Sequence, residues 1–168
     1  SRRPRRDAER CGASASRATW GYANRGASGI DGNIATAAGV AGEGATAVLG
    51  DLATLHDLNS LALLRTNKVV LVVINNGGGG IFSFLPVSEH GELVEEFFGT
   101  PHECDFQFAA NMFDINYTHP STMTDFRQEY ETALDAASST IIEVTTDRDE
   151  NLAFHRTLEQ NVINYMKS

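Results

Sequence analysis

ATAVLGDLATLHDLNSLALLRTNKVVLVVINNGGGG, residues 45–80, is the stretch that decides the fold of this chain. It contains two short apolar runs, residues 45–49 and 69–74, whose length and composition are typical of buried parallel strands. Between the runs, apolar residues at helical spacing predict a helix; they are Leu58, Leu61, Ala62, Leu63 and Leu64. The stretch therefore predicts a strand, helix, strand unit with a right-handed crossover, whose two parallel strands end side by side.

Polar side chains follow both predicted strands at the point where each strand ends. Asp51 follows the first strand, and Asn75 and Asn76 close the second, 24 and 25 positions later. Because neighbouring strands lie about 4.8 Å apart, Asp51 and Asn76 could contact one ion whose oxygen ligands lie at about 2.1 Å. Mg²⁺ commonly keeps few protein ligands and completes its shell with water and phosphate oxygens. The spacing therefore predicts a split magnesium site for a bound diphosphate.

Four glycines, residues 77–80, extend this prediction. Without Cβ atoms their backbone can lie against a ligand, so we expect amides for phosphate and one carbonyl for the metal. The amino end of the helix that follows Asp51 is expected to face the same anion. The patterns alone leave a simpler interpretation open, because Asp and Asn favour turns and glycine tracts occur in ordinary loops. The tract also lacks the lysine of a Walker motif.

Strand and helix patterns alternate along the rest of the chain. The expected elements are a first strand at 20–23, helices at 33–40, 106–113, 124–137 and from about Asn151, strands at 115–117 and 140–145, and a long surface excursion at 81–98. Thr122 or Thr124 is expected to cap the helix at 124–137. This order predicts an α/β fold with an open, mainly parallel sheet and helices on both faces. Ligands of such sheets bind outside the carboxyl ends of the strands, where Asp51 and Asn76 fall.

Charge and cysteine content limit the possible functions of this 168-residue chain. Residues 1–25 have a net charge of +5, whereas residues 26–168 have a net charge of −14, which argues against nucleic-acid binding by the body. We expect residues 1–20 to be a disordered basic end, although a nucleic-acid tail, a membrane tail or part of a transit sequence stays open. Two cysteines give no disulfide framework and favour a soluble protein of a reducing compartment. The longest uninterrupted apolar stretch, residues 69–74, is too short to span a membrane.

Two signatures resemble known enzymes. Gly50-Asp51 followed by Asn75-Asn76 resembles the thiamine-diphosphate motif of decarboxylases and acetohydroxyacid synthases. Residues 24–32, Asn-Arg-Gly-Ala-Ser-Gly-Ile-Asp-Gly, resemble the signature of the 2-succinyl-5-enolpyruvyl-6-hydroxy-3-cyclohexene-1-carboxylate (SEPHCHC) synthase family of menaquinone and phylloquinone biosynthesis. Further matches lie at residues 55–59, 79–83 and 85–86. Residues 74–82 and 157–159 most resemble the plant and algal branch, for which a chloroplast location is expected, and otherwise the cytoplasm.

The resemblance implies a role for each matching residue. Asp51 and Asn76 would bind Mg²⁺ through their side chains and Gly78 through its carbonyl, while amides near Leu52 and Ala53 would hold the diphosphate of thiamine diphosphate. Ile30 would prop the cofactor in its bent form. Arg25 would bind a substrate carboxylate, and an apolar wall beside the substrate would consist of Ile81, Phe82 and Leu85. Simpler interpretations remain, because Arg25 could pair with an acid such as Asp31, and Ile30 could be an ordinary core residue.

The resemblance also implies a reaction and partners. The family decarboxylates 2-oxoglutarate and adds the resulting succinic semialdehyde unit to isochorismate. Its cofactor lies between this kind of domain, expected over residues 21–168, and a pyrimidine-binding domain that supplies the activating glutamate. We therefore expect no catalytic residue in this chain, no turnover by the chain alone, and a homodimer or homotetramer in the complete enzyme. Another thiamine-diphosphate decarboxylase or acetohydroxyacid synthase, or a non-catalytic remnant that binds cofactor or a partner, are the alternatives.

Overall fold

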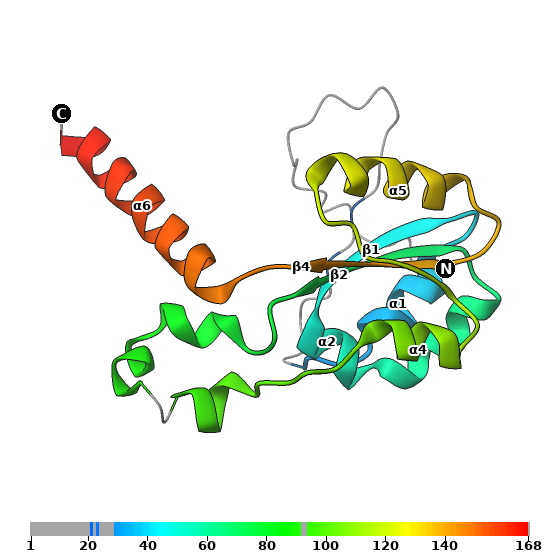
Figure 1. Ribbon diagram of the computed structural model, residues 1–168, viewed down its shortest axis with the longest axis horizontal. Coiled ribbons are helices and arrows are strands. Elements are labelled where there is room, and N and C mark those ends of the chain that lie inside the picture. Colours follow the sequence, from blue (N-terminus) through cyan, green and yellow to red (C-terminus); the bar gives the residue numbers. More distant parts are fainter. Residues whose placement is uncertain (1–20, 22, 24–28, 92–93, 168) are drawn as a thin grey trace, which may run out of the picture.

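The computed structural model describes residues 21, 23, 29–91 and 94–167, and its centre is a four-stranded sheet. The strands are β1 (Ala45–Gly50), β2 (Val69–Asn75), β3 (Asn116–Thr118) and β4 (Thr140–Thr145). Their order is β1-β2-β4-β3, and all three pairings are parallel (Figure 1). The predicted open parallel sheet is therefore confirmed, and each of its strands lies within one or two residues of its expected position.

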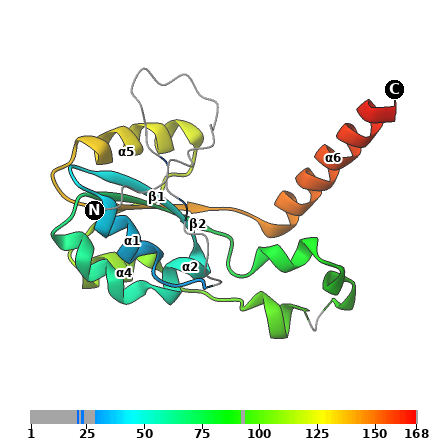
Figure 2. The same ribbon diagram turned by 180° about the vertical axis from the view of Figure 1, so that it is seen from behind.

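Helices cover both faces of the sheet, as predicted (Figures 1 and 2). One face is covered by α1 (Asn33–Val40), α2 (Asp51–His56) and α4 (Phe106–Met112), and the other by α5 (Met123–Asp135). Thr122, one of the two expected caps, accepts a hydrogen bond from the amide of Asp125 at the start of α5. On the α5 side the edge strand β1 stays partly uncovered, since its Val48 is 64% exposed.

The single helix expected between β1 and β2 is divided in two. After α2, the chain continues as a 3₁₀ helix, η1 (Leu58–Arg65). The break falls at Asp57, which has a non-helical backbone. Its carboxylate accepts hydrogen bonds from the amides of Ile34 and Ala35, at 2.6 and 3.1 Å, and from the hydroxyl of Ser60. The sequence pattern missed this division because a contact with a distant helix produces it.

Two apolar clusters fill the space between sheet and helices. The larger one lies under α1, η1 and α4, and its fully buried members include Ile34, Leu61, Leu71, Phe106 and Ile141. The smaller one lies under α5 and contains Val70, Val72, Ala133 and Ile142. Strand β2 contributes alternate residues to both clusters, which explains its uninterrupted apolar sequence.

The excursion after β2 lies on the surface, as predicted. It consists of short turns, η2 (Gly80–Phe84), η3 (Pro86–His90) and a π-type turn, η4 (Glu95–Gly99). Of these turn residues only Gly99 is buried. The last helix, α6 (Arg148–Lys167), extends away from the sheet in both views (Figures 1 and 2). It begins three residues before the expected Asn151 because the side chain of Asp147 accepts hydrogen bonds from the amides of Asp149 and Glu150.

Some expectations fall on residues that the structure does not describe. The basic segment 1–20 and Arg25 lie outside the described residues, and so do Trp20 and Tyr22 of the expected first strand, whose described residues Gly21 and Ala23 are not in a strand. Within the described ranges, no helix combines the length and the apolar character needed to cross a lipid bilayer.

Candidate functional site

The carboxyl ends of β1 and β2 lie side by side, and the loops that follow them meet at Asp51 and Gly78. In the parallel register Gly50 pairs with Ile74, so Asp51 and Asn75 each come one residue further along. The loop after β2 then turns onto Asp51, and the amide of Gly78 donates a hydrogen bond of 2.8 Å to Asp51 Oδ2. Asp51 is 3% exposed. Two of the three predicted metal ligands, Asp51 and Gly78, are therefore in direct contact.

The two adjacent asparagines have different environments. Asn75 Nδ2 donates to Glu143 on β4 at 2.6 Å, and Asn75 Oδ1 accepts from the amide of Gly77 at 3.0 Å. Asn76 Oδ1 is buried and has no hydrogen-bond partner within the part of the chain that the structure describes. Because a buried polar atom without a partner is costly, this oxygen is the one available for a ligand.

The donor chemistry at this place fits a small divalent cation. It offers one carboxylate at Asp51, one unpartnered amide oxygen at Asn76 and one carbonyl at Gly78, and oxygen is the ligand atom that Mg²⁺ prefers. The Gly78 carbonyl already accepts from the amide of Gly80 at 3.0 Å, which leaves its second lone pair. No group of three or more His, Cys, Asp or Glu side chains suited to a metal occurs among the described residues. A cation at this site would therefore depend on neutral oxygens for most of its protein ligands.

The glycine loop differs from the expectation that its amides would be available for phosphate. All four amides donate within the protein: Gly77 to Asn75 Oδ1, Gly78 to Asp51 Oδ2, Gly79 to the Gly99 carbonyl and Gly80 to the Gly78 carbonyl. The absence of side chains instead permits a close approach by residues 98–101. A Cβ at Gly78, where φ is +143°, would lie 2.5 Å from the Gly99 carbonyl oxygen. In this structure the loop packs against another segment of the chain.

The other predicted site residues have varied surroundings. The Leu52 amide donates to Asp51 Oδ1 at 2.7 Å, and Leu52 and Ala53 are half-buried in α2. Ile30 is 42% exposed, so it is not part of the core formed by the described residues. Ile81 and Leu85 are exposed, whereas Phe82 is half-buried and packs on Phe98 with ring centroids 5.4 Å apart.

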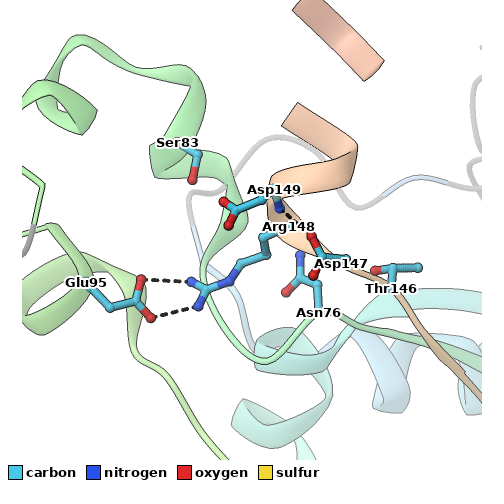
Figure 3. Close-up of a pocket in the computed structure, with 7 residues that line it drawn as sticks. All are labelled: Asn76, Ser83, Glu95, Thr146, Asp147, Arg148 and Asp149. Carbon is cyan, nitrogen blue, oxygen red and sulfur yellow. Dashed lines mark hydrogen bonds and ion pairs between the residues drawn. The ribbon is translucent and has the colours of Figure 1, made fainter. Parts of the chain in front are cut away.

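A pocket of about 430 Å³ opens beside Asn76, at the ends of β2 and β4 (Figure 3). It is lined by Asn76, Ser83, Glu95, Thr146, Asp147, Arg148 and Asp149. Arg148 spans it and makes two hydrogen bonds to the Glu95 carboxylate, at 2.7 and 3.1 Å. These bonds raise the pKa of Arg148 above its ordinary value. Asn76 therefore lines the same pocket as the ion pair between Glu95 of η4 and Arg148 of α6.

The sequence patterns missed His102. Its Nε2 lies 3.1 Å from Asp51 Oδ2, although the two residues are 51 positions apart. No pattern of spacing could identify this contact, because it depends on how the excursion returns to the sheet. Among the predicted and missed residues, the structure therefore brings Asp51, Gly78 and His102 together.

Relatives of this chain have been found among curated proteins, although no protein-family model matches it. It is 56% identical over 139 residues to a SEPHCHC synthase of Rubrobacter xylanophilus, covering 81% of this chain and 24% of the relative. It is 48% identical over 163 residues to the corresponding synthase of Salinibacter ruber, covering 95% of this chain and 27% of the relative. The chain thus spans about a quarter of the length of these relatives. Both are bacterial, so they give no support to the chloroplast expectation.

A solved structure agrees with this relationship. The thiamine diphosphate-dependent 4-hydroxybenzoylformate decarboxylase of Rhodococcus jostii RHA1 superposes with a TM-score of 0.53 and 27% identity, over 61% of this chain and 19% of that one. Sequence and fold agree: the chain has the fold of the thiamine-diphosphate-dependent enzymes and is a homologue of one segment, about a quarter of the length, of the SEPHCHC synthases.

Proposed function

We propose that this chain is the part of a SEPHCHC synthase that binds the diphosphate of thiamine diphosphate through Mg²⁺. The observation that carries the proposal is the buried, unpartnered Oδ1 of Asn76, in the same loop as Gly78, whose amide contacts Asp51. A cation would satisfy this oxygen. With one carboxylate as the only charged protein ligand, a divalent cation keeps a positive charge with which to attract a diphosphate.

Each residue has a defined part in this proposal. Asp51 and Asn76 bind the metal through their side chains and Gly78 through its carbonyl, while the amides near Leu52 and Ala53 lie close to the diphosphate. Ile30 props the bound cofactor, and its exposed side chain suits that contact. When bound, thiamine diphosphate supplies the electron sink for decarboxylation, so the chain contributes binding and orientation.

The complete reaction is proposed for the complete enzyme. It decarboxylates 2-oxoglutarate and adds the succinic semialdehyde unit to isochorismate, in the biosynthesis of menaquinone or phylloquinone. Arg25 would bind a substrate carboxylate, and Ile81, Phe82 and Leu85 would form an apolar wall. Exposure of Ile81 and Leu85 leaves them available to a substrate or to a pyrimidine-binding domain of the same or a partner subunit. We expect the assembled enzyme to be a homodimer or homotetramer.

The alternative carboligases and decarboxylases are less well supported. Relatives at 48% and 56% identity are SEPHCHC synthases, whereas the decarboxylase of Rhodococcus jostii RHA1 reaches 27%. A remnant that binds cofactor without catalysis would have the same metal site. Binding of the cofactor is therefore the property to measure, because the proposed metal site requires it.

Calorimetric titration with thiamine diphosphate, with and without Mg²⁺, tests the proposal. We expect binding that depends on Mg²⁺ and that Asn76→Ala weakens by more than about tenfold, since even changes in residues behind a metal ligand commonly cost that much. Asn76 suits the test better than Asp51, because Asp51→Ala would also remove the three hydrogen bonds that the Asp51 carboxylate makes with Leu52, Gly78 and His102. Equal affinity in wild type and Asn76→Ala would contradict the proposal.

The neighbouring asparagine is the matched control. Asn75→Ala removes the same kind of side chain but breaks the hydrogen bonds to Glu143 and Gly77. We expect it to lower the free energy of unfolding by about 1–3 kcal/mol and to leave the dependence of cofactor binding on Mg²⁺ in place. Asn76→Ala should show the reverse pattern, with stability preserved and metal dependence lost.

A further inference from the structure

His102 lies behind the Asp51 carboxylate, in a nearly buried position. The His102 and Asp51 side chains are 10% and 4% exposed, and His102 Nε2 lies 3.1 Å from Asp51 Oδ2. The imidazole ring packs edge-on against Phe106, with centroids 6.4 Å apart. The ring is therefore held both by an apolar neighbour and by the carboxylate.

The second ring nitrogen defines the direction of this hydrogen bond. The backbone amide of Cys104 donates to His102 Nδ1 at 3.2 Å, so Nδ1 accepts and carries no proton. The proton of the neutral ring then lies on Nε2, which donates to Asp51 Oδ2. A continuous path runs from a backbone amide, through the imidazole, to the carboxylate.

The contacts of the Asp51 carboxylate leave one position for a metal. An ionised carboxylate has about four acceptor positions. At Asp51, Oδ2 accepts from Gly78 and His102, and Oδ1 accepts from Leu52. One position on Oδ1 remains, so the three donors orient the carboxylate while leaving it able to bind a cation.

The glycine loop is what allows His102 to reach this place. The Gly79 amide donates to the Gly99 carbonyl at 2.6 Å, and a Cβ at Gly79 would lie 3.0 Å from the Phe98 carbonyl oxygen. At Gly77 a Cβ would lie 4.0 Å from the His102 carbonyl oxygen. Segment 98–102 therefore packs directly against the backbone of the glycine loop. This packing and the contact between His102 Nε2 and Asp51 Oδ2 together fix the position of His102 relative to Asp51.

We propose that His102 is a positioning residue for the metal site: its Nε2–H holds the Asp51 carboxylate in the orientation that binds the divalent cation. This inference rests on the proposed function. A histidine could instead occupy the place of the cation and have to leave before the metal binds. The two roles predict opposite effects, because removing a positioning group weakens metal binding, whereas removing an occupant strengthens it.

The test compares two amides in place of the imidazole. In His102→Gln the side-chain nitrogen can take the place of Nε2 and still donate to Asp51, whereas in His102→Asn the side chain is too short. Both variants lose the ring contact with Phe106, so their difference isolates the hydrogen bond. The dissociation constant of Mn²⁺, an oxygen-binding substitute for Mg²⁺, is measured on the 168-residue chain with thiamine diphosphate present, from the electron paramagnetic resonance signal of free Mn²⁺.

We expect His102→Asn to weaken Mn²⁺ binding by about 10- to 100-fold and His102→Gln to stay within about threefold of wild type. Unchanged or tighter binding by His102→Asn would overturn the inference, and so would equal losses in both variants. Asn76→Ala separates this result from the proposed function. If wild type binds Mn²⁺ and Asn76→Ala does not, while His102→Asn equals wild type, only the role of His102 fails; if wild type itself binds no Mn²⁺, both fail.

Discussion

Glu143 is a second buried carboxylate close to the candidate site, and its partners explain why the two asparagines differ. It is 6% exposed on β4 and accepts hydrogen bonds from Asn75 Nδ2 at 2.6 Å and from the Tyr117 hydroxyl at 2.7 Å. A buried carboxylate needs such donors to offset the loss of hydration. Glu143 therefore holds Asn75 towards β4, which leaves Asn76 as the asparagine with an available oxygen.

Tyr117→Phe tests this network and has a defined dependence on pH. Burial, followed by the hydrogen bond to Glu143, raises the pKa of Tyr117 above its ordinary value. The contribution of Tyr117 to stability is therefore complete below pH of about 10, the unfolded value, and is lost as pH rises towards the folded value. We expect Tyr117→Phe to cost about 1–3 kcal/mol at pH 7 and to flatten the decline above pH 10 by up to about 1.4 kcal/mol per pH unit.

Denaturant titrations at pH 7, 9, 10 and 11 provide the measurement. Tyr165→Phe removes a hydroxyl from a position on α6 that is 84% exposed, and it is the control for the substitution itself. An alkaline decline of the same steepness in Tyr117→Phe and wild type would show that Tyr117 does not hold its proton in the way described.

The position of a residue could be predicted where it depends on spacing along the sequence. It could not be predicted where it depends on a tertiary contact. Asp51 and Asn76 could be placed at neighbouring strand ends because each directly follows a strand, and parallel strands bring their ends together. His102 and Glu143 were missed, since they are 51 and 68 positions from the residues they contact. The amide of Leu52, a residue expected near the diphosphate, donates to Asp51 in this structure, a contact that no spacing pattern predicts.

Among the secondary structure elements, the strands and helices that form the core agree best with expectation. Strand β2 and helix α1 have the predicted bounds to within one residue, because β2 is continuously apolar and α1 follows a glycine-rich turn. The excursion at 81–98 was predicted only as a surface segment. Its short turns have little apolar periodicity, and contacts such as the ion pair between Glu95 and Arg148 help to hold it.

Glu95→Gln tests how the excursion is attached to α6. The Arg148 and Glu95 side chains are 24% and 50% exposed, and such ion pairs contribute at most about 1 kcal/mol to stability. We therefore expect the free energy of unfolding to change by less than about 1 kcal/mol. The local effect should be larger, because η4 loses its ion pair with Arg148. Amide hydrogen exchange in residues 95–99, measured by mass spectrometry, should therefore become faster.

Glu96→Gln is the matched control, since it removes a neighbouring charge without touching the Arg148 pair. It should leave exchange in η4 as it is in wild type. Equal exchange rates in η4 for Glu95→Gln and wild type would mean that the ion pair does not hold the excursion in place.

For the chain as a whole, the distribution of apolar surface is uneven. The sheet and helices α1 to α5 enclose two apolar clusters, whereas α6 has no buried residue and extends away from them (Figures 1 and 2). Its exposed apolar side chains are Phe154, Leu158, Val162, Ile163, Tyr165 and Met166. A row of apolar side chains on one helix usually packs against another surface, and this chain spans only about a quarter of the length of its relatives.

Removal of residues 152–168 tests whether the folded core is independent of α6. We expect the free energy of unfolding to change by less than about 1 kcal/mol, because no residue of α6 is buried and its His155 meets Phe84 only at the surface, with ring centroids 5.2 Å apart. Binding of a dye that detects exposed apolar surface should fall. Leu64→Ala, at a position 1% exposed in the core, provides the comparison and should cost about 2–5 kcal/mol. If the truncation costs as much as Leu64→Ala, α6 is part of the cooperative core, and its apolar side chains are not available to another surface.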